Sequence, residues 1–551
     1  MHINITVGMM RILLTALLGF FGATNDYCKT STNSCTDITK KHWTWKRINQ
    51  NEYIFPSYFL FGAGTSAHQI EENCDNNTWG KNSRYAQQLR IIKQSEFDKT
   101  WNEQKDNWCK NFYKVYCRKP TQAEINQHKE EHFTFCFAGD ACKSWQYYKK
   151  DVQALKQLGC SAYRFSVAWE KIMPTEDTFD AAALQHYVDV CDELIANNIK
   201  PVITLYHYTE PLWFDAKGGF EKAENIKYYV AFCTKIFETL GDRVHLYLTF
   251  NSPIGGIALN SYHQGGRPPF KKNSKVTCQV IINLLDAHVA AYKAKELVNP
   301  NLKVGILKNT HQLDTWNKWN PIDHLVCKMG NKLQDDPFYQ FFTTGKIDMM
   351  LPFKIQHENK NAPYSLDFVG LNYYGHRYLK VGLGLSKKCS PKEQRCGTPG
   401  NYHESYTIYP EGIYRALMSM HERLIKPLRQ NTGRHLPIYV TENGIGTNDE
   451  NQRTEFMKKY LYAISRAIQN GCDVRGYFYW SLLDNYEWGR YSKCYGLFKV
   501  AKDTFDRIIK PSASHYMNLI AAHTKAGIDT LKTGSVNDIT VHIVDTQVSI
   551  Q

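Results

Sequence analysis

Short apolar runs alternate with longer amphipathic stretches along most of this 551-residue chain. Eight runs have the length and the β-branched or aromatic content of buried strands, and most are separated by apolar positions at helical spacing. The predicted strands are Phe59–Ala63, Ala162–Val167, Pro201–Leu205, Leu246–Phe250, Lys303–Leu307, Phe368–Leu371, Ile438–Val440 and Gly476–Tyr479. The predicted helices include Trp145–Gly159, Leu184–Asn197, Ile226–Leu240, Val280–Val298 and Arg453–Asn470. This alternation predicts a parallel sheet, and eight repeats predict an α/β fold with a single closed (β/α)8 TIM barrel and loop insertions.

The two ends of the chain lie outside the repeating pattern. Arg11 precedes an apolar run, Ile12–Ala23, which is too short to span a bilayer comfortably and is typical of a secretory signal peptide. We therefore expect a signal peptide at residues 1–24, a barrel at 25–522 with an inserted region at 81–137, and a C-terminal extension at 523–551. Export would make the protein secreted, periplasmic or lumenal, with no membrane attachment after cleavage.

Composition narrows the function classes. The net charge is +14, but lysine and arginine are scattered among acidic residues and form no stripe for nucleic acid. Sixteen cysteines lie beyond the signal, and together with export they predict disulfides that pin loops, in a pairing the sequence leaves open. The clusters outside the predicted core are Cys28 and Cys35, then Cys74, Cys109, Cys117, Cys136 and Cys142, then Cys389 and Cys396. No Cys/His spacing resembles a zinc site, neither metal nor cofactor is expected, and no pattern indicates an oligomeric state.

The strand at Ile438–Val440 runs into a carboxylate. The segment Thr441-Glu442-Asn443-Gly444 places an acidic residue at the end of a buried run and follows it with an Asn-Gly turn. A glutamate there is poorly placed for solvation. Two interpretations stay open: an ion pair with a buried arginine, or a nucleophile or general base that faces a cleft.

The other predicted strand ends are also polar and aromatic. Active sites of (β/α)8 barrels form at the carboxyl ends of the strands. The residues found there are Gln69, Arg164, His207, Asn251, Ser252, Asn372, Tyr374, Glu442, Trp480, Glu487 and Trp488. Taken singly, an amide could cap a turn and a histidine or tryptophan could belong to the core. Their coincidence at one end of one barrel favours a sugar pocket, where side chains bind hydroxyls beside tryptophan faces.

Five longer segments carry a family resemblance. They are Phe59–Glu71, Tyr163–Trp169, Asp367–Tyr374, Tyr439–Gly444 and Gly476–Trp488. In this order they resemble glycoside hydrolase family 1, the β-glucosidase and myrosinase family, over about Phe59 to Tyr516. The resemblance implies a retaining enzyme that acts on a small-molecule β-glycoside with two carboxylates. One attacks the anomeric carbon, and the other protonates the leaving oxygen and then activates water.

The resemblance also implies residue roles. Glu442 matches the nucleophile, and Arg164 and Tyr374 match the residues that keep this carboxylate charged and aimed. Asn251 matches the residue at the sugar 2-hydroxyl, where a hydrogen bond strengthens in the transition state. The other residues matched to substrate binding are Gln69, His207, Asn372, Glu487, Trp480 (the floor under the ring) and Trp488 (beside the remote hydroxyls).

One position departs from the family pattern. The family carries Asn-Glu-Pro where this chain has Asn251-Ser252-Pro253, so Ser252 stands at the acid/base position. A serine hydroxyl is too weak an acid to replace a group worth about 10²–10⁴ in rate. Tyr208 and Thr209 also replace the family's usual Trp-Asp.

Several alternatives to an impaired glycosidase stay open. The barrel could be a non-catalytic sugar binder, as in klotho-like relatives, or a thioglucosidase, since plant myrosinases also lack this glutamate. Transglycosylation is a weaker possibility, as is rescue by Glu210 after the third strand. A phospho-sugar substrate, suggested by Lys493 and Tyr495, is disfavoured because Glu487 would repel phosphate.

Overall fold

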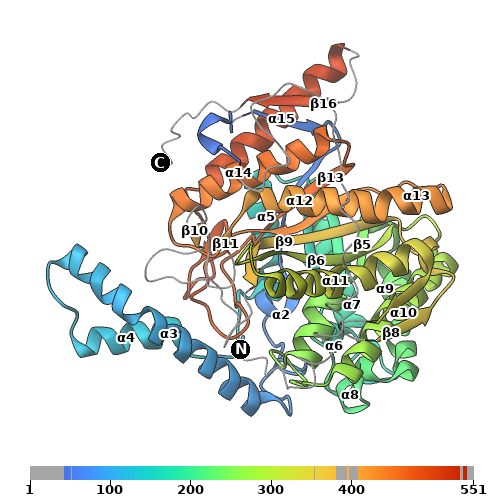
Figure 1. Cartoon of the computed structure of the whole chain (residues 1–551), viewed down its shortest axis with the longest axis horizontal. Helices are drawn as coiled ribbons and strands as arrows, with labels where there is room; N and C mark the ends of the chain where they lie inside the picture. The colour runs from blue at the N-terminus through green and yellow to red at the C-terminus, as the bar shows by residue number, and fades with distance from the viewer. Residues whose placement is uncertain are drawn as a thin grey trace.

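The computed structural model describes residues 43–50, 52–350, 352, 354–379, 394–395, 407–533 and 538–542. Its central element is a closed barrel of parallel strands, as predicted (Figure 1). The eight barrel strands are β2 (Leu60–Gly64), β3 (Ala162–Ser166), β4 (Lys200–Tyr206), β5 (Leu246–Asn251), β6 (Val304–Thr315), β9 (Phe368–Leu379), β12 (Ile438–Asn443) and β13 (Val474–Trp480). Strand β13 pairs with β2, and β6 pairs with β9, so the ring has no free edge.

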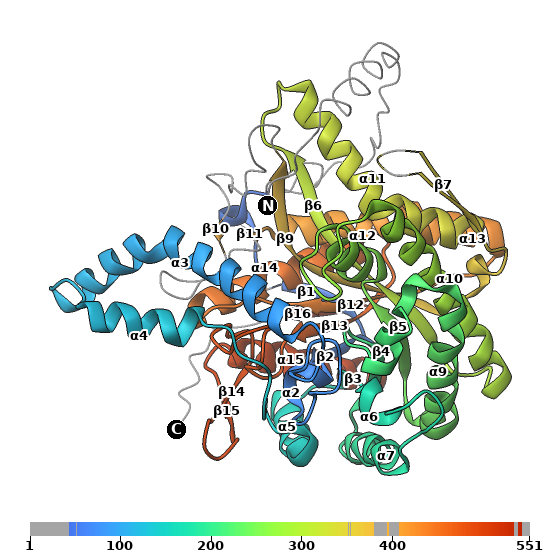
Figure 2. The ribbon, with the colours of Figure 1, turned by 90° about the horizontal axis from the view of Figure 1, so that it is seen from below.

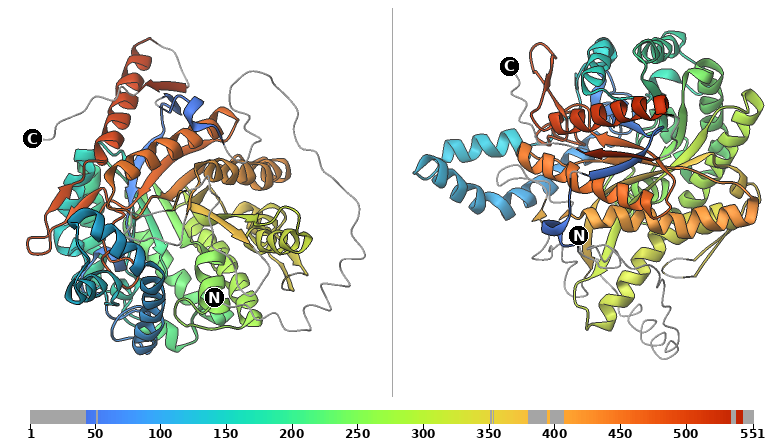
Figure 3. Two further views of the ribbon diagram at one scale, coloured as in Figure 1. Left: turned by 60° about the vertical axis from the view of Figure 1, so that its left-hand side comes forward. Right: turned by 90° about the horizontal axis from the view of Figure 1, so that it is seen from above.

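Helices surround the barrel and cover its outer face (Figures 1 and 3). The helices that follow or flank the strands are α2 (Ala67–Ile70), α5 (Ser144–Leu158), α6 (Trp169–Ile172), α7 (Ala181–Ala196), α8 (Leu212–Ala216), α9 (Ile226–Leu240), α10 (Ser274–Val298), α11 (Pro321–Thr344), α12 (Pro410–Met420), α13 (Lys426–Thr432), α14 (Glu450–Gln469) and α15 (Ala513–Thr533). A π-helix, η5 (Pro253–His263), leaves the end of β5 directly. The predicted (β/α)8 architecture is confirmed.

The interior of the barrel is a packed apolar core, and the polar end of the barrel rests on it. Its buried side chains are Leu60, Ala162, Val202, Leu246, Leu248, Leu307, Phe368, Tyr439 and Phe478. They come from all eight barrel strands, since alternate residues of a strand point inward. The site above them therefore rests on a rigid layer of side chains.

The inserted region forms a helical hairpin of α3 (Ala86–Tyr116) and α4 (Gln122–Phe133). Figures 1 and 2 show the hairpin projecting from the barrel. Its base packs in an aromatic cluster that contains Trp79, Phe97 and Trp101, and Trp488 lies against this cluster. The insertion therefore reaches the neighbourhood of a predicted substrate-binding residue.

Smaller strand pairs complete the fold. The first of them, β1 (Glu52–Pro56), pairs antiparallel with β16 (Asp538–His542), so the chain beyond residue 523 returns to the body of the protein. The remaining strands are β7 (Lys346–Met349), β8 (Ile355–Glu358), β10 (Gln394–Arg395), β11 (Thr407–Ile408), β14 (Phe498–Val500) and β15 (Arg507–Ile509). The proposed domain limits stay a prediction, and the predicted signal peptide lies outside the described residues. Within the part of the chain described here, we find no helix with the length and apolar character of a membrane span.

The predicted disulfides are absent from the central cysteine cluster. Cys74, Cys109, Cys117, Cys136 and Cys142 are all free thiols. Cys109 and Cys117 lie eight residues apart near the end of α3, a rise of about 12 Å, which exceeds the Cα separation that a disulfide allows. The burial of Cys74 and Cys142 explains why they behave as small core residues instead. Cys28, Cys35, Cys389 and Cys396 lie outside the described residues.

Candidate active site

Glu442 is held by donors on both of its carboxylate oxygens. It lies at the end of β12 and is 5% exposed. Arg164 of β3 places Nη1 2.5 Å from Oε1, and the Tyr374 hydroxyl, from β9, donates to Oε2 at 2.8 Å. Charge-assisted hydrogen bonds of this kind fix the orientation of the carboxylate. The ion pair that the strand pattern left open is therefore present, and its geometry also suits an aimed nucleophile.

A buried polar network extends from this pair across neighbouring strands. Arg164 donates to Asn251 Oδ1 at 3.2 Å and to Thr204 Oγ1 at 3.0 Å. Asn372 donates to the same Asn251 oxygen at 3.0 Å and accepts from Thr441 Oγ1 at 2.8 Å. The two threonines were not identified from the sequence. The only signal was a hydroxyl side chain within an otherwise apolar strand, which core packing also tolerates.

His207 presents a hydrogen-bond donor to the site. Asn251 Oδ1 accepts two bonds, so its amide Nδ2, 3.1 Å from His207 Nε2, acts as the donor. Burial, assisted by Arg164 and Arg267, holds the pKa of His207 well below its usual range, so the ring is neutral. The proton then sits on Nδ1, which has no hydrogen-bond partner among the described residues. A sugar hydroxyl is the kind of acceptor that this nitrogen lacks.

Gln69 and Glu487 form a second polar pair. Gln69 Nε2 donates to Glu487 Oε2 at 2.9 Å, and its Oε1 accepts from Ser66 Oγ at 2.7 Å. Burial raises the pKa of Glu487, while Lys493 and the bond from Gln69 oppose this rise. The carboxylate is thus positioned as a hydroxyl acceptor.

Two tryptophans flank His207. The ring centroids of His207 and Trp480 are 5.8 Å apart at an angle of 14°, and those of His207 and Trp488 are 6.3 Å apart at 9°. Gly444 is required beside Trp480, because a methyl group there would lie 1.7 Å from the Trp480 carbonyl oxygen. The turn after Glu442 therefore packs directly on the tryptophan strand. Aromatic faces in this arrangement suit the C–H surface of a sugar ring.

Ser252 lies at the same end of the barrel, directly after Asn251. Its backbone is left-handed, with φ of 56°, and its side chain is buried. The Ser252 Oγ accepts from the Gly256 N–H at 2.9 Å and so caps η5. The hydroxyl thus has a structural task as an N-cap.

Glu210 lies apart from this network. Within the described residues its carboxyl group accepts one hydrogen bond, from the Tyr206 hydroxyl at 3.3 Å, and Tyr206 packs against Phe220. A cavity of about 10 Å³, the size of a single water, adjoins the carboxyl group. Burial, assisted by Asp215, raises the pKa of Glu210 to about 8.

Glu210→Gln is expected to stabilise the protein increasingly as pH rises from 5 to 8. The raised pKa means that the folded state holds a proton that the unfolded state releases above about 4.5, so the parent loses stability across this window. The amide does not titrate. We expect a gain in unfolding free energy of about 2–4 kcal/mol at pH 8, falling toward zero at pH 5. Urea unfolding at each pH measures it.

A matched control is Glu103→Gln at an exposed position of α3, where the difference should not change with pH. A pH-independent difference for Glu210→Gln would show that its carboxyl group is not protonated in the folded state.

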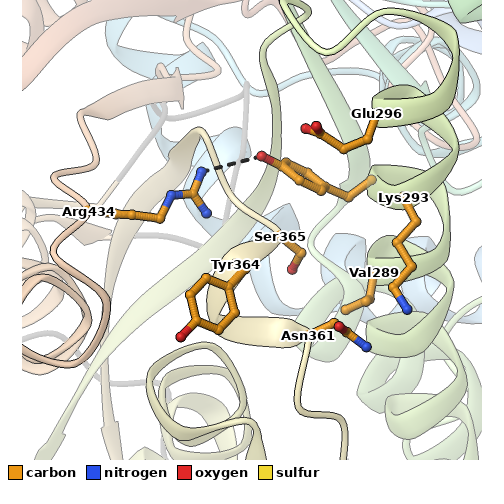
Figure 4. Close-up of a pocket in the computed structure, with 8 residues that line it drawn as sticks. Val289, Lys293, Glu296, Asn361, Tyr364, Ser365 and Arg434 are labelled. Atoms are coloured by element: carbon orange, nitrogen blue, oxygen red, sulfur yellow. Dashed lines mark hydrogen bonds between the residues drawn. The ribbon is translucent and has the colours of Figure 1, made fainter.

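A hollow that is unrelated to these residues lies at the opposite end of the barrel. It has a volume of about 360 Å³, and its lining includes Tyr364, Ser365 and Arg434, which precede β9 and β12 (Figure 4). Arg434 is already bound there, donating to the Tyr292 hydroxyl at 3.3 Å and pairing with Asp367. Conserved chemistry of (β/α)8 barrels lies at the other end, so this hollow is not the candidate site.

Most of the eleven residues predicted for the site therefore lie at or directly after the carboxyl ends of barrel strands. Gln69 lies in α2, and Asn372 and Tyr374 lie within β9, which continues past the barrel. Barrel enzymes that process carbohydrates combine a buried carboxylate with hydroxyl-binding amides and tryptophan faces at this end, and the chain falls in that class.

Comparison with known proteins gives the family. The family model of glycosyl hydrolase family 1 matches residues 51–525, so the chain belongs to this family. Avenacosidase 2 from Avena sativa is 29% identical over 518 residues, which cover 83% of this chain and 80% of that protein. A 1,4-beta-D-glucan glucohydrolase from Thermotoga neapolitana is 29% identical over 401 residues, covering 69% and 87%. A beta-glycosidase from Pyrococcus horikoshii superposes with a TM-score of 0.66 at 31% identity, covering 86% and 96%. The protein is an enzyme of this family, similar to β-glucosidases.

Proposed function

We propose that the protein is a retaining β-glycosidase that uses Glu442 as its nucleophile and works without a carboxylic general acid. The observation that carries the proposal is the buried Glu442 carboxylate with Arg164 on one oxygen and Tyr374 on the other. The two donors aim the carboxylate and leave it lone pairs that can attack carbon. The names of the relatives, which include glucosidases and a glycosidase, support a β-glucoside as substrate, with a β-galactoside as the alternative.

The proposed reaction has two steps. A Glu442 oxygen forms a bond to the anomeric carbon while the bond to the aglycone breaks, and its electron pair leaves with the aglycone. Water then attacks the same carbon, Glu442 is released, and the proton of that water passes to solvent. Asn251, His207, Gln69 and Glu487 would bind the sugar hydroxyls. Trp480 would support the ring, with Asn372 holding Asn251 in place and Trp488 at the rim.

Ser252 sets the limits of this activity. Because it offers no acidic proton, aglycones that leave readily as anions should react, while ordinary alkyl glycosides should react slowly. A thioglucoside, whose leaving group needs no protonation, fits the same limits. The N-terminal sequence supports export, so the substrate would be met in a secreted, periplasmic or lumenal setting.

Incubation with 2,4-dinitrophenyl 2-deoxy-2-fluoro-β-glucoside tests the nucleophile. The fluorine slows the second step, so we expect one fluoroglucosyl group per chain in the intact mass, located on the peptide that contains Glu442. The Glu442→Gln variant should remain unlabelled. The second candidate, a sugar binder without catalysis, is favoured only by Ser252. It would be supported if glucose bound measurably and the reagent left no adduct at high concentration.

A further inference from the structure

Arg267 is a cation beside the candidate site that has no counter-ion in the part of the chain that the structure describes. Its Nη1 atom is buried and has no hydrogen-bond partner among the described residues, and no described carboxylate lies within ion-pair distance of the guanidinium. The guanidinium carbon lies 3.9 Å from the centroid of the Tyr208 ring and 5.4 Å from that of Trp488. Burying part of a charged group without a partner is costly, so this site favours an anion.

The guanidinium lies on the side of Ser252. Tyr208, on which it stacks, reaches the start of η5, since a methyl group added to Gly256 would lie 2.6 Å from the Tyr208 hydroxyl and 2.9 Å from the Ser252 Cβ. Arg267 also acts on His207, where its charge helps to keep the ring neutral. These contacts put Arg267 next to the position from which the aglycone departs.

The inserted hairpin adds a second cation to this neighbourhood. Lys93 of α3 lies 5.8 Å above the Trp79 ring, and Trp79 packs on Trp488 at 4.7 Å. Lys93 is paired with Glu96 at 3.0 Å, and burial together with Arg267 lowers the pKa of its ammonium group. Lys93 is therefore already neutralised by its neighbour, and Arg267 is the group left to bind a ligand.

We propose that Arg267 forms an aglycone subsite for an oxyanion, so that the preferred substrates are β-glycosides whose aromatic aglycone carries a carboxylate or a similar anionic group. This inference rests on the proposed function of the same site. The planar guanidinium matches a carboxylate in a bidentate arrangement, and Tyr208 and Trp488 provide the faces against which an aromatic aglycone packs.

Two matched glucosides test the subsite. These are 4-nitrophenyl β-glucoside and the same compound with a carboxylate ortho to the nitro group, which changes the charge and largely keeps the leaving ability. We expect the parent protein to prefer the carboxylated compound by about tenfold or more in kcat/KM. In Arg267→Met the ratio of the two values should fall to near one, and Arg267→Lys should keep part of it. Arg118→Met, which removes an exposed cation at the hairpin tip, is the control and should leave the ratio unchanged.

Binding of the two free nitrophenols gives a readout that does not need turnover. The carboxylated phenol should bind the parent at least about tenfold more tightly than 4-nitrophenol, and Arg267→Met should lose this difference. Equal affinities in the parent, or a preference that survives in Arg267→Met, would overturn the subsite. A binding preference that depends on Arg267, combined with no turnover and no fluoroglucosyl adduct, would support the subsite and refute the glycosidase.

Discussion

Glu442→Gln is expected to lower kcat for 2,4-dinitrophenyl β-glucoside by at least about 10³-fold, because the amide cannot attack the anomeric carbon. The substitution keeps the shape of the side chain, and one oxygen remains to accept a hydrogen bond from Arg164 or Tyr374. The loss should fall on kcat rather than KM, since the sugar-binding side chains are unchanged. Release of dinitrophenolate measures the rate directly.

The same change should also destabilise the fold. Arg164 is fully buried, and Glu442 is its only ion-pair partner among the described residues. Removing one member of a buried pair typically costs about 3–5 kcal/mol. The thermal midpoint and circular dichroism must therefore be recorded with the kinetics, so that unfolding is not mistaken for lost chemistry.

Glu442→Asp separates these two effects. Aspartate keeps the charge beside Arg164 and withdraws the oxygens by the length of one methylene group. We expect stability nearer to that of the parent but a rate loss of about 10² or more, because a misplacement of roughly 1 Å can cost that much. A folded Glu442→Gln protein with parental activity would mean that another group is the nucleophile.

The sequence could predict the barrel because each strand carries its own signal. Apolar runs at regular spacing located all eight strands to within a few residues, except where two strands outgrow the barrel. The ends of β6 and β9 were predicted at Leu307 and Leu371, yet the strands continue to Thr315 and Leu379. They continue because they pair with each other beyond the barrel, and the extra residues of β6 are mostly polar. A contact between distant segments leaves no such local pattern.

The candidate site was also predictable only where a residue carries a local sequence signal. Residues directly after a strand could be located, because the carboxyl ends of parallel strands meet. Thr204 and Arg267 could not be located from the sequence. The threonine lies inside a strand, and the arginine follows a π-helix whose path no periodic pattern predicts. Their roles depend on which side chains the fold brings near them. The same reason explains why the disulfide prediction was wrong for Cys74, Cys109, Cys117, Cys136 and Cys142, while for the cysteines outside the described residues it stays a prediction.

Ser252→Glu is expected to raise kcat/KM for 4-nitrophenyl β-glucoside by about 10–10²-fold, toward the 10²–10⁴ that general acid–base assistance supplies. The new carboxyl group would protonate the leaving oxygen and later take a proton from water. Its effect should be smaller on 2,4-dinitrophenyl β-glucoside, which leaves without help. The gain should disappear at high pH, because only the protonated form can donate, and a pH profile of the variant measures this alkaline limb.

Ser252→Gln is the matched control, since it has the size of glutamate and no acidic proton. Both variants lose the cap on the Gly256 N–H, which is worth about 1 kcal/mol, and both retain the left-handed backbone at this position. If the two variants lose the same stability, a difference in their activity must come from the acidic proton that only glutamate carries. If glutamate gave no more activity than glutamine in two folded variants, Ser252 would not occupy the acid/base position, and the departing aglycone would have to be assisted from elsewhere in the site.

The direction of the Ser252 side chain makes this a demanding test, because its hydroxyl points at the η5 backbone rather than being free to turn. For activity to rise, the glutamate side chain must turn away from the Gly256 N–H and reach the sugar. It can do so only if the space beside Tyr208 and Arg267 is open to a ligand.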